Sequence, residues 1–265
     1  MTTASSPQRV HARREATLAL LLASLTAACW LALWAWSASP YARYLDHAGW
    51  GDTSSLGALC STIVVPTTVH ALAWVLMIAA MMLPTTWPLL AMFRRVSAGR
   101  PERDRLVAWV VAGFFLVWLV FGTFAHALDL ALRALAQRSG WLALNGWIVA
   151  AAVLAGAGAF QFSALKYRCL EACHSPFSFV ASRWHGTSPE RDAFRIGVDH
   201  GVFCVGCCWA LMLVMFVVGL GSIGWMLALA AVMAAEKNLP WGKRLRTPLG
   251  AGLLAWSLAL VISHV

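Results

Sequence analysis

The sequence predicts an all-α protein, a polytopic transmembrane helical bundle of about seven spans. Of its 265 residues, 60% are hydrophobic and only 12% are charged, and the mean hydropathy is +0.71. Soluble globular domains carry about 25% charged residues, so this composition argues against a water-soluble enzyme. The apolar residues form long continuous runs and do not alternate with polar ones, which excludes a transmembrane β-barrel.

The individual spans are predicted from these runs, because about 20 apolar residues cross a bilayer. The runs lie at about 16–38, 69–93, 107–131, 144–163, 200–218, 221–235 and 248–264. Pro84 and Pro88 predict a kink inside the second run. The fifth and sixth runs are short and are separated by a tight hairpin at 219–222. Residues 1–15 are interpreted as a cytoplasmic basic tail, and residues 16–265 as a single transmembrane helical domain.

The orientation follows from the distribution of basic residues. The tail and the segments 94–106, 164–198 and 236–247 contain 17 of the 20 Lys and Arg residues. All four lie on one side of the predicted bundle, and cytoplasmic loops are the ones enriched in Lys and Arg. We therefore expect a cytoplasmic N-terminus and a periplasmic C-terminus. This pattern also accounts for the net charge of +9 without nucleic acid as a partner.

Five of the seven cysteines fall into two groups. Cys169 and Cys173 follow the fourth run, and Cys204, Cys207 and Cys208 lie in the first turns of the fifth. Residues three and four apart share a helix face, so two neighbouring helices can supply several sulfurs to one ion. Thiolates suit Cu(I), Zn or iron–sulfur clusters, and the reducing cytosol keeps thiols free. The alternatives to a metal site are that these cysteines carry out thiol–disulfide chemistry or that they are inert side chains packed in the core.

Methionine and histidine residues extend these cysteine groups. On the fifth run His200 precedes Cys204 by four residues, and His174 directly follows Cys173. On the second run Met81 and Met82 offer thioether ligands. These neighbours favour copper(I) over zinc, although zinc with four thiolates is the alternative. The predicted metal ligands are Cys169, Cys173, Cys204, Cys207, Cys208, Met81, Met82, His174 and His200.

The combined motifs resemble the uncharacterised bacterial family of predicted metal-binding integral membrane proteins. The resemblance covers residues 70–245 and rests on Met81-Met82-Leu83-Pro84, Lys166 through Cys173 to Pro176, Cys204-Val205-Gly206-Cys207-Cys208-Trp209, and Glu236-Lys237 through Pro240-Trp241-Gly242. It implies a multi-pass protein of the bacterial inner membrane with a metal site at these cysteines, but no known reaction. His174 and Phe203 depart from the family pattern, which often has a basic residue at the first position and an aromatic hydroxyl at the second.

The leading functional hypothesis is a copper(I)-binding membrane protein with a cytoplasmic-side cysteine cluster that acts in metal handling or delivery, and the sequence leaves open whether the protein is an enzyme. The alternatives are a membrane thiol–disulfide oxidoreductase that uses Cys204 and Cys207, and a structural or accessory subunit of a larger membrane complex. The expected partners are the lipid bilayer and either a metal chaperone or such a complex. A reversible disulfide would favour the oxidoreductase, and tolerance of Cys→Ser changes would favour the subunit.

Overall fold

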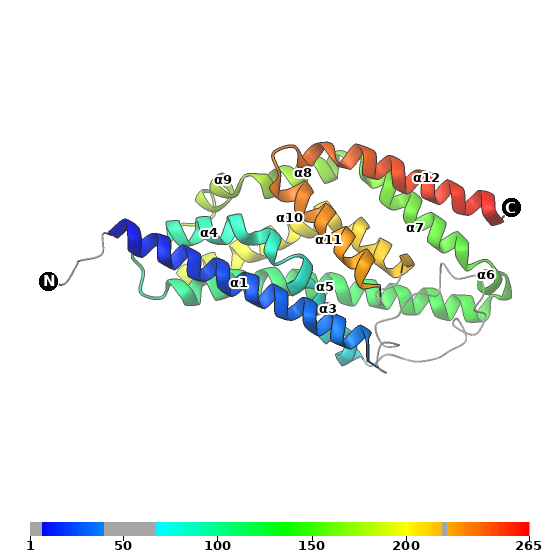
Figure 1. Ribbon diagram of the computed structural model, residues 1–265, viewed down its shortest axis with the longest axis horizontal. Coiled ribbons are helices and arrows are strands. Elements are labelled where there is room, and N and C mark those ends of the chain that lie inside the picture. The colour runs from blue at the N-terminus through cyan, green and yellow to red at the C-terminus, as the bar shows by residue number, and fades with distance from the viewer. Residues whose placement is uncertain (1–6, 40–66, 219–221, 265) are drawn as a thin grey trace.

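The computed structural model describes residues 7–39, 67–218 and 222–264, and the elements in this part of the chain are all helical (Figure 1). The elements are α1 (Pro7–Ser37), α3 (Thr67–Met81), η2 (Pro84–Thr86), α4 (Trp87–Val96), α5 (Arg103–Arg138), α6 (Gly140–Leu144), α7 (Gly146–Phe160), α8 (Ala164–His174), α9 (Pro176–Ala181), α10 (Pro189–Val218), α11 (Ile223–Asn238), η3 (Gly242–Arg244) and α12 (Arg246–His264). The predicted all-α fold class is confirmed.

The long helices α5 and α10 lie side by side and form the centre of the bundle (Figure 1). They begin at the same end, where Arg105 of α5 pairs with Glu190 of α10 at 2.6 Å. Gly113, Gly197 and Gly201 line their contact, and a Cβ on any of them would collide with the facing helix. Small residues of this kind let membrane helices approach closely. These glycines therefore set the distance between the two central helices.

Most of the predicted apolar runs form helices, or bent helix pairs, that are long enough to span a membrane. Four described helices are long and apolar enough to cross a membrane, and two bent helix pairs raise that number to six. The first pair joins α3 to η2 and α4 with a bend of 46°, and the second joins α7 to α8 with a bend of 62°. The predicted run 221–235 is the short helix α11, which has 16 residues. The predicted hairpin at 219–222 lies largely outside the described residues.

The bend in the second run is the predicted proline kink. Helix α3 ends at Met81, and η2 starts at Pro84 with Pro88 one turn later. Proline has no backbone N–H and its ring clashes with the preceding turn, so the α-helical ladder is interrupted here. Thr85 and Thr86 satisfy freed carbonyls by donating to Met82 and Leu83 at 2.7 Å each. The break turns the Met82 side chain into the core, where it is fully buried.

Helix α10 is longer than its apolar run and begins at Pro189, not near residue 200. Proline is favoured in the first turn of a helix, and Glu190 and Asp192 there complement the helix dipole. The cysteines of α10 consequently lie near the middle of a long helix and not in its first turns. Helix α5 is similarly extended, with 36 residues that span about 54 Å.

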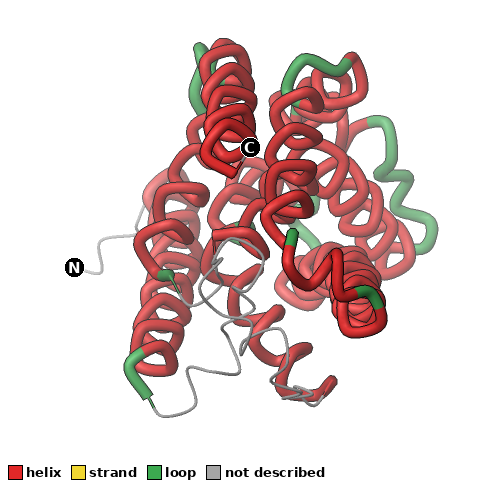
Figure 2. The backbone as a smooth tube through the Cα atoms, turned by 90° about the vertical axis from the view of Figure 1, so that its right-hand side faces the viewer, coloured by secondary structure: helices red, strands yellow, loops and turns green. Residues whose placement is uncertain are grey.

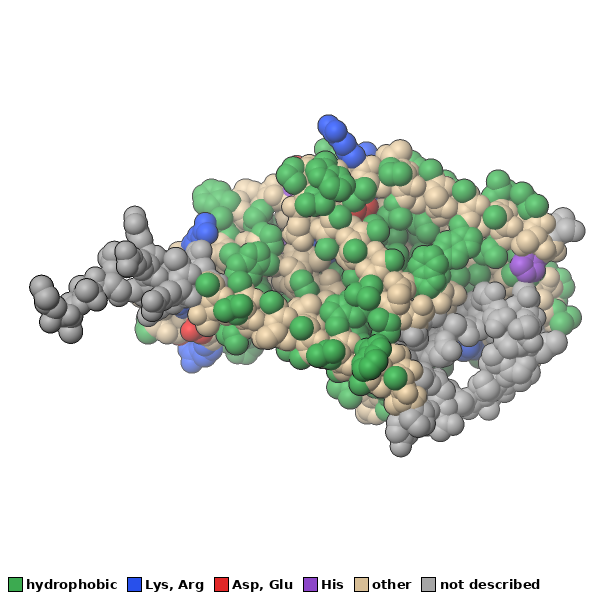
Figure 3. Space-filling model, in the orientation of Figure 1, with side chains coloured by type: hydrophobic (Ala, Val, Ile, Leu, Met, Phe, Trp, Pro, Cys, Tyr) green, Lys and Arg blue, Asp and Glu red, His purple; other side chains and the backbone are tan. Residues whose placement is uncertain are grey.

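The outer surface of the bundle is apolar. Large hydrophobic side chains such as Leu20, Val120, Phe124, Leu258 and Ile262 are more than half exposed. Figure 3 shows hydrophobic side chains over most of one face, with Lys and Arg side chains toward its left end and upper edge. The end-on view in Figure 2 shows the helices packed around one another without a second domain in the described part. Such a surface is compatible with a protein that lies in a membrane.

Candidate metal centre

Four elements meet around the cysteines of α10. Helix α8 packs against α10, and Cys169 contacts the backbone at Gly206, where an added Cβ would lie 2.6 Å from its Sγ. The other two elements are the end of α11 and the break between α3 and η2. Together they enclose Met82, Cys204, Cys207 and Cys208, each at most 2% exposed. We call the three sulfurs of Met82, Cys204 and Cys208, which converge on one point, the sulfur cage.

The point on which the sulfur cage converges is taken by an ammonium group. The Lys237 Nζ atom lies 2.9 Å from Cys204 Sγ, 3.8 Å from Cys208 Sγ and 3.6 Å from Met82 Sδ. It also lies 3.5 Å from Thr85 Oγ1. Lys237 is only 5% exposed, and in the described part of the chain no carboxylate pairs with it. The sulfur lone pairs are therefore turned toward a buried monovalent cation.

A second buried charge lies next to the sulfur cage but is neutralised. Lys166 of α8 donates to Glu236 of α11 at 2.8 Å, and the two side chains are 0% and 2% exposed. Glu236 precedes Lys237, so one helix end carries both a paired carboxylate and an ammonium without such a partner. His174 donates from Nε2 to the Glu236 carbonyl at 2.7 Å. This hydrogen bond fixes α8 to α11 and uses one of the two nitrogens of His174.

The remaining cysteines connect the sulfur cage with the outside of α8. The Cys207 thiol interacts with that of Cys173, and Cys169 is buried against Gly206. Cys173 is half-buried, whereas Cys169, Cys204, Cys207 and Cys208 are buried, and all of them are free thiols. A chain of thiols thus leads from a partly accessible position on α8 to the interior of α10.

The other predicted ligands take different positions. His200 lies one helical turn before Cys204, between the rings of Phe114 and Phe179 at 5.9 and 5.8 Å. It is 5% exposed, and its Nδ1 has no hydrogen-bond partner among the described residues. Met81 is buried in the same hydrophobic core, but the sulfur cage contains the sulfur of Met82.

The donor set around the Lys237 ammonium consists of sulfur atoms. Among the described residues, no three His, Cys, Asp or Glu side chains are placed to hold a metal ion together. The converging donors are instead two thiols and one thioether, with an ammonium between them. Sulfur donors of this kind suit Cu(I), Zn and iron–sulfur clusters, and structural zinc prefers four thiolate or imidazole ligands. The cage therefore offers soft sulfur ligands.

Comparison with known families agrees with this chemistry. A family model described as PpoB2, copper chaperone, matches residues 71–260. The chain belongs to this copper chaperone family. Family membership supports a copper-related role and agrees with the resemblance to metal-binding membrane proteins. No curated protein and no solved structure matches the chain.

Sequence reasoning named Lys237 only as part of the Glu236-Lys237 motif and missed its central place. The available signal was the pair Glu236-Lys237 at the end of an apolar run, on the same predicted side as five cysteines. Thr85 and the partner of Glu236, Lys166, were also missed as members of the site. Only the packing of α8 and α11 on α10 brings these residues together.

Proposed function

We propose that this protein is a membrane copper chaperone that holds one copper(I) ion as cargo in the sulfur cage. Cys204 and Cys208 would bind as thiolates and Met82 as a thioether. The observation that carries this proposal is the convergence of three buried sulfurs on the Lys237 ammonium. A copper(I) ion at the cage would take over the place of that ammonium, which would move aside on its flexible side chain.

Charge balance supports copper(I) as the cargo. Burial of an uncompensated charge is costly, and the Lys166–Glu236 pair already sums to zero. Two thiolates, one copper(I) ion and the Lys237 ammonium also sum to zero. Binding would release the two thiol protons, so each thiol exchanges a proton for a bond to the metal. Zinc with the same two thiolates would leave one positive charge in the interior.

The remaining thiols would carry the ion between the surface and the sulfur cage. Cys173 is the only one of the five clustered cysteines that is half-buried, and its thiol meets Cys207. Copper(I) can pass between thiolates by exchange of one ligand at a time. We place the protein in the bacterial inner membrane, with the N-terminus and the cysteines on the cytoplasmic side, because the basic segments lie on that side of the predicted bundle.

Burial disfavours thiol–disulfide exchange as the alternative function. In such exchange a thiolate attacks an accessible disulfide sulfur. Cys204 and Cys207, which have the Cys-x-x-Cys spacing, are 0% and 2% exposed. No partner thiol can reach either sulfur without a rearrangement of α8, α10 and α11. A small ion needs a much smaller opening than a partner protein.

The test is the copper content of detergent-purified protein loaded with copper(I) under anaerobic conditions. We expect one copper per chain in the wild type and a sulfur-only first shell by X-ray absorption at the copper edge. Cys204→Ser and Cys208→Ser should each lose the copper. Cys29→Ser is the matched control, because Cys29 is a buried free thiol on α1 outside the clustered cysteines. Retention of copper by the Cys204→Ser, Cys208→Ser double variant would contradict the proposal.

A further inference from the structure

A group of basic side chains lies at the surface near the outermost thiol of the candidate metal centre. Helix α8 and the segment that joins α11 to α12 contain four of them, Arg168, Lys243, Arg244 and Arg246, which are exposed or half-buried. We call these four residues the basic shelf. In Figure 3, Lys and Arg side chains project from the upper edge, where Figure 1 has η3 and the start of α12. The basic shelf shares no residue with the sulfur cage.

Contacts between the two segments hold the basic shelf together. Lys243 pairs with Glu171 of α8. Lys243 Nζ and Arg246 Cζ lie 5.8 and 5.2 Å from the centroid of the Tyr167 ring. A cation over an aromatic face is attracted by the ring quadrupole. The segment before α12 is thereby fixed against α8, which carries Arg168 directly after Tyr167.

The basic shelf lies close to the point where the series of thiols reaches the surface. Cys173 is in the last turn of α8 and is half-buried. Glu171 and Arg168 precede it by about 3 and 7.5 Å along the helix axis. A standard protein interface covers about 800 Å² on each partner, which is a patch about 28 Å across. One docked protein can therefore cover both the basic shelf and Cys173.

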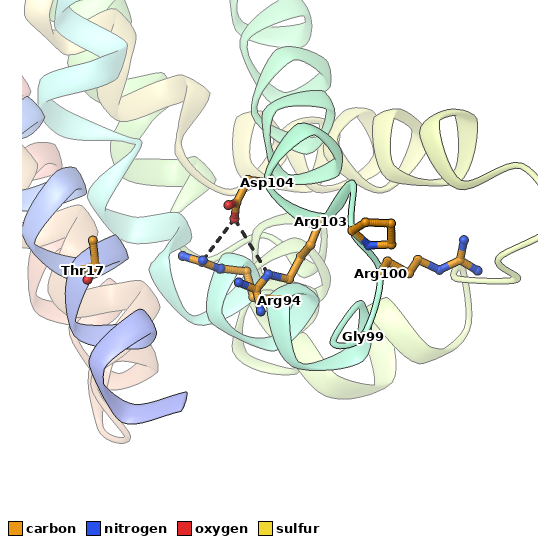
Figure 4. Close-up of a pocket in the computed structure, with 7 residues that line it drawn as sticks. Thr17, Arg94, Gly99, Arg100, Arg103 and Asp104 are labelled. Carbon is orange, nitrogen blue, oxygen red and sulfur yellow. Dashed lines mark hydrogen bonds and ion pairs between the residues drawn. The ribbon is translucent and has the colours of Figure 1, made fainter. Parts of the chain in front are cut away.

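The charge of the basic shelf is largely uncompensated. Glu171 is the one exposed carboxylate of the two segments, and four basic groups minus one carboxylate leave a charge of +3. The end of the bundle where α5 begins is different, because Asp104 there pairs with Arg94 at 3.1 Å and lies 3.8 Å from Arg103 (Figure 4). Positive charge near Cys173 is therefore available to a partner outside the chain.

The charge of a copper(I) carrier matches this surface. One copper(I) ion held by two thiolates has a net charge of −1, and a carrier that surrounds it with carboxylates is more negative still. Complementary charge steers such a carrier to its docking surface and fixes its orientation. An anionic lipid headgroup would also match the charge, but it has no use for the half-buried thiol of Cys173.

We propose that the basic shelf docks a soluble protein that presents copper(I) on two cysteine thiolates within an acidic surface. This proposal rests on the proposed function, because it assigns the route by which copper(I) reaches the sulfur cage. In the docked complex the bond between copper and one carrier sulfur breaks, and a bond to Cys173 Sγ forms. The proton of the Cys173 thiol passes to the released carrier thiolate. Nothing is oxidised or reduced in this exchange.

The test measures how fast copper(I) passes to the full chain in phosphatidylcholine nanodiscs under anaerobic conditions. The probe is a synthetic peptide that holds copper(I) on a Cys-x-x-Cys pair flanked by Glu residues, compared with the same peptide flanked by Lys residues. We expect the Glu peptide to transfer copper about ten-fold faster at about 0.02 M salt. The two rates should converge at about 0.5 M salt, where the Debye length is about 4 Å.

The Arg168→Gln, Arg244→Gln double variant should slow transfer from the Glu peptide about three-fold or more, because it removes two charges of the basic shelf. Both arginines are exposed, so we expect the helix content to stay unchanged. Arg191→Gln, Arg195→Gln is the matched control. It removes the same charge from exposed positions on α10, and Arg195 precedes Cys207 by about 18 Å of helix. The control should transfer copper at the rate of the wild type.

The copper content at equilibrium is measured first and separates this proposal from the proposed function. We expect one copper per chain in the wild type and in both variants, because no substituted arginine belongs to the sulfur cage. A wild type without copper would overturn the sulfur cage and the docking surface with it. Equal rates for the two peptides, or an unchanged rate in the Arg168→Gln, Arg244→Gln variant, would overturn the docking surface alone.

Two further outcomes would overturn the docking surface by identifying another ligand. The first is loading from a copper(I) complex of a small anionic monothiol that is as fast as loading from the Glu peptide, which would identify a small thiolate complex as the source. The second is an effect of the Arg168→Gln, Arg244→Gln variant that appears only when the nanodiscs contain phosphatidylglycerol, which would identify a lipid headgroup.

Discussion

Replacement of Lys237 by Met tests the role of the ammonium in the sulfur cage. Two opposing effects decide the result. Without copper, the ammonium forms one short hydrogen bond, to Cys204 Sγ at 2.9 Å, and a hydrogen bond to a charged group contributes about 1.5–3 kcal/mol. Copper must break this hydrogen bond, so its removal favours copper binding. With copper bound by two thiolates, the ammonium faces a complex of net charge −1 and stabilises it.

The second effect is the larger one. Two unit charges about 4 Å apart interact by about 4 kcal/mol at an effective dielectric constant of 20. After subtraction of the first effect, the ammonium favours the loaded state by about 1–2.5 kcal/mol. Since 1.36 kcal/mol corresponds to a factor of ten, Lys237→Met should bind copper(I) about 5- to 70-fold more weakly. Zinc with two thiolates is neutral, so the same variant should bind zinc more tightly than the wild type.

The assay is competition with a chromogenic copper(I) chelator in detergent, together with a parallel zinc titration. Lys243→Met is the matched control, because Lys243 forms a peripheral ion pair with Glu171 and does not contact the sulfur cage. It should leave both affinities unchanged. A Lys237→Met protein that binds copper(I) as tightly as the wild type, or more tightly, would refute the charge-balance reasoning.

Two further predictions concern stability, measured by thermal unfolding in detergent followed by tryptophan fluorescence. Gly197→Val should destabilise the bundle by about 1–3 kcal/mol, because its Cβ would collide with the Val110 carbonyl. Gly252→Val is the control and should be near neutral, because an added Cβ there meets nothing within 4 Å. Equal effects of the two substitutions would contradict the packing argument. Glu236→Leu should lower the free energy of unfolding by about 3–5 kcal/mol, because it leaves the Lys166 ammonium buried without its partner. Adding Lys166→Met should recover most of that loss. A double variant as unstable as the single one would refute this explanation.

Much of the fold could be predicted because local features determine it. Continuous apolar runs predicted α1, α5, α10 and α12, and Pro84 predicted the bend in the second run. The predicted start of α10 was wrong, because hydropathy marks where apolar residues begin and not where the helical backbone begins. Favourable first-turn residues extend α10 to Pro189 through a charged segment. Helix ends outside the apolar run leave little trace in hydropathy.

The candidate site was only partly predictable, for a different reason. Cysteine spacing indicated that Cys204 and Cys208 share a helix face, and both contribute to the sulfur cage. The central position of Lys237 depends on how the end of α11 packs against η2 and α10. Adjacent residues on a helix point about 100° apart, yet Glu236 and Lys237 are both buried. Their burial requires partners from other helices, and no local pattern specifies those partners.

On the function proposed above, the number of thiols favours transfer of the ion over its storage. One buried ammonium without a carboxylate partner balances two thiolates and one copper(I) ion, whereas five cysteines cluster on α8 and α10. Were all five thiolates at once, the interior would hold a large negative charge, which low-dielectric surroundings disfavour. At any moment most of these thiols must therefore be protonated and uncharged. Their use lies in ligand exchange: Cys173 is half-buried and its thiol meets Cys207, so an ion can enter or leave in steps that never bury more than two thiolates. A storage site has no need of such intermediate ligands, whereas a chaperone must both accept and release its ion.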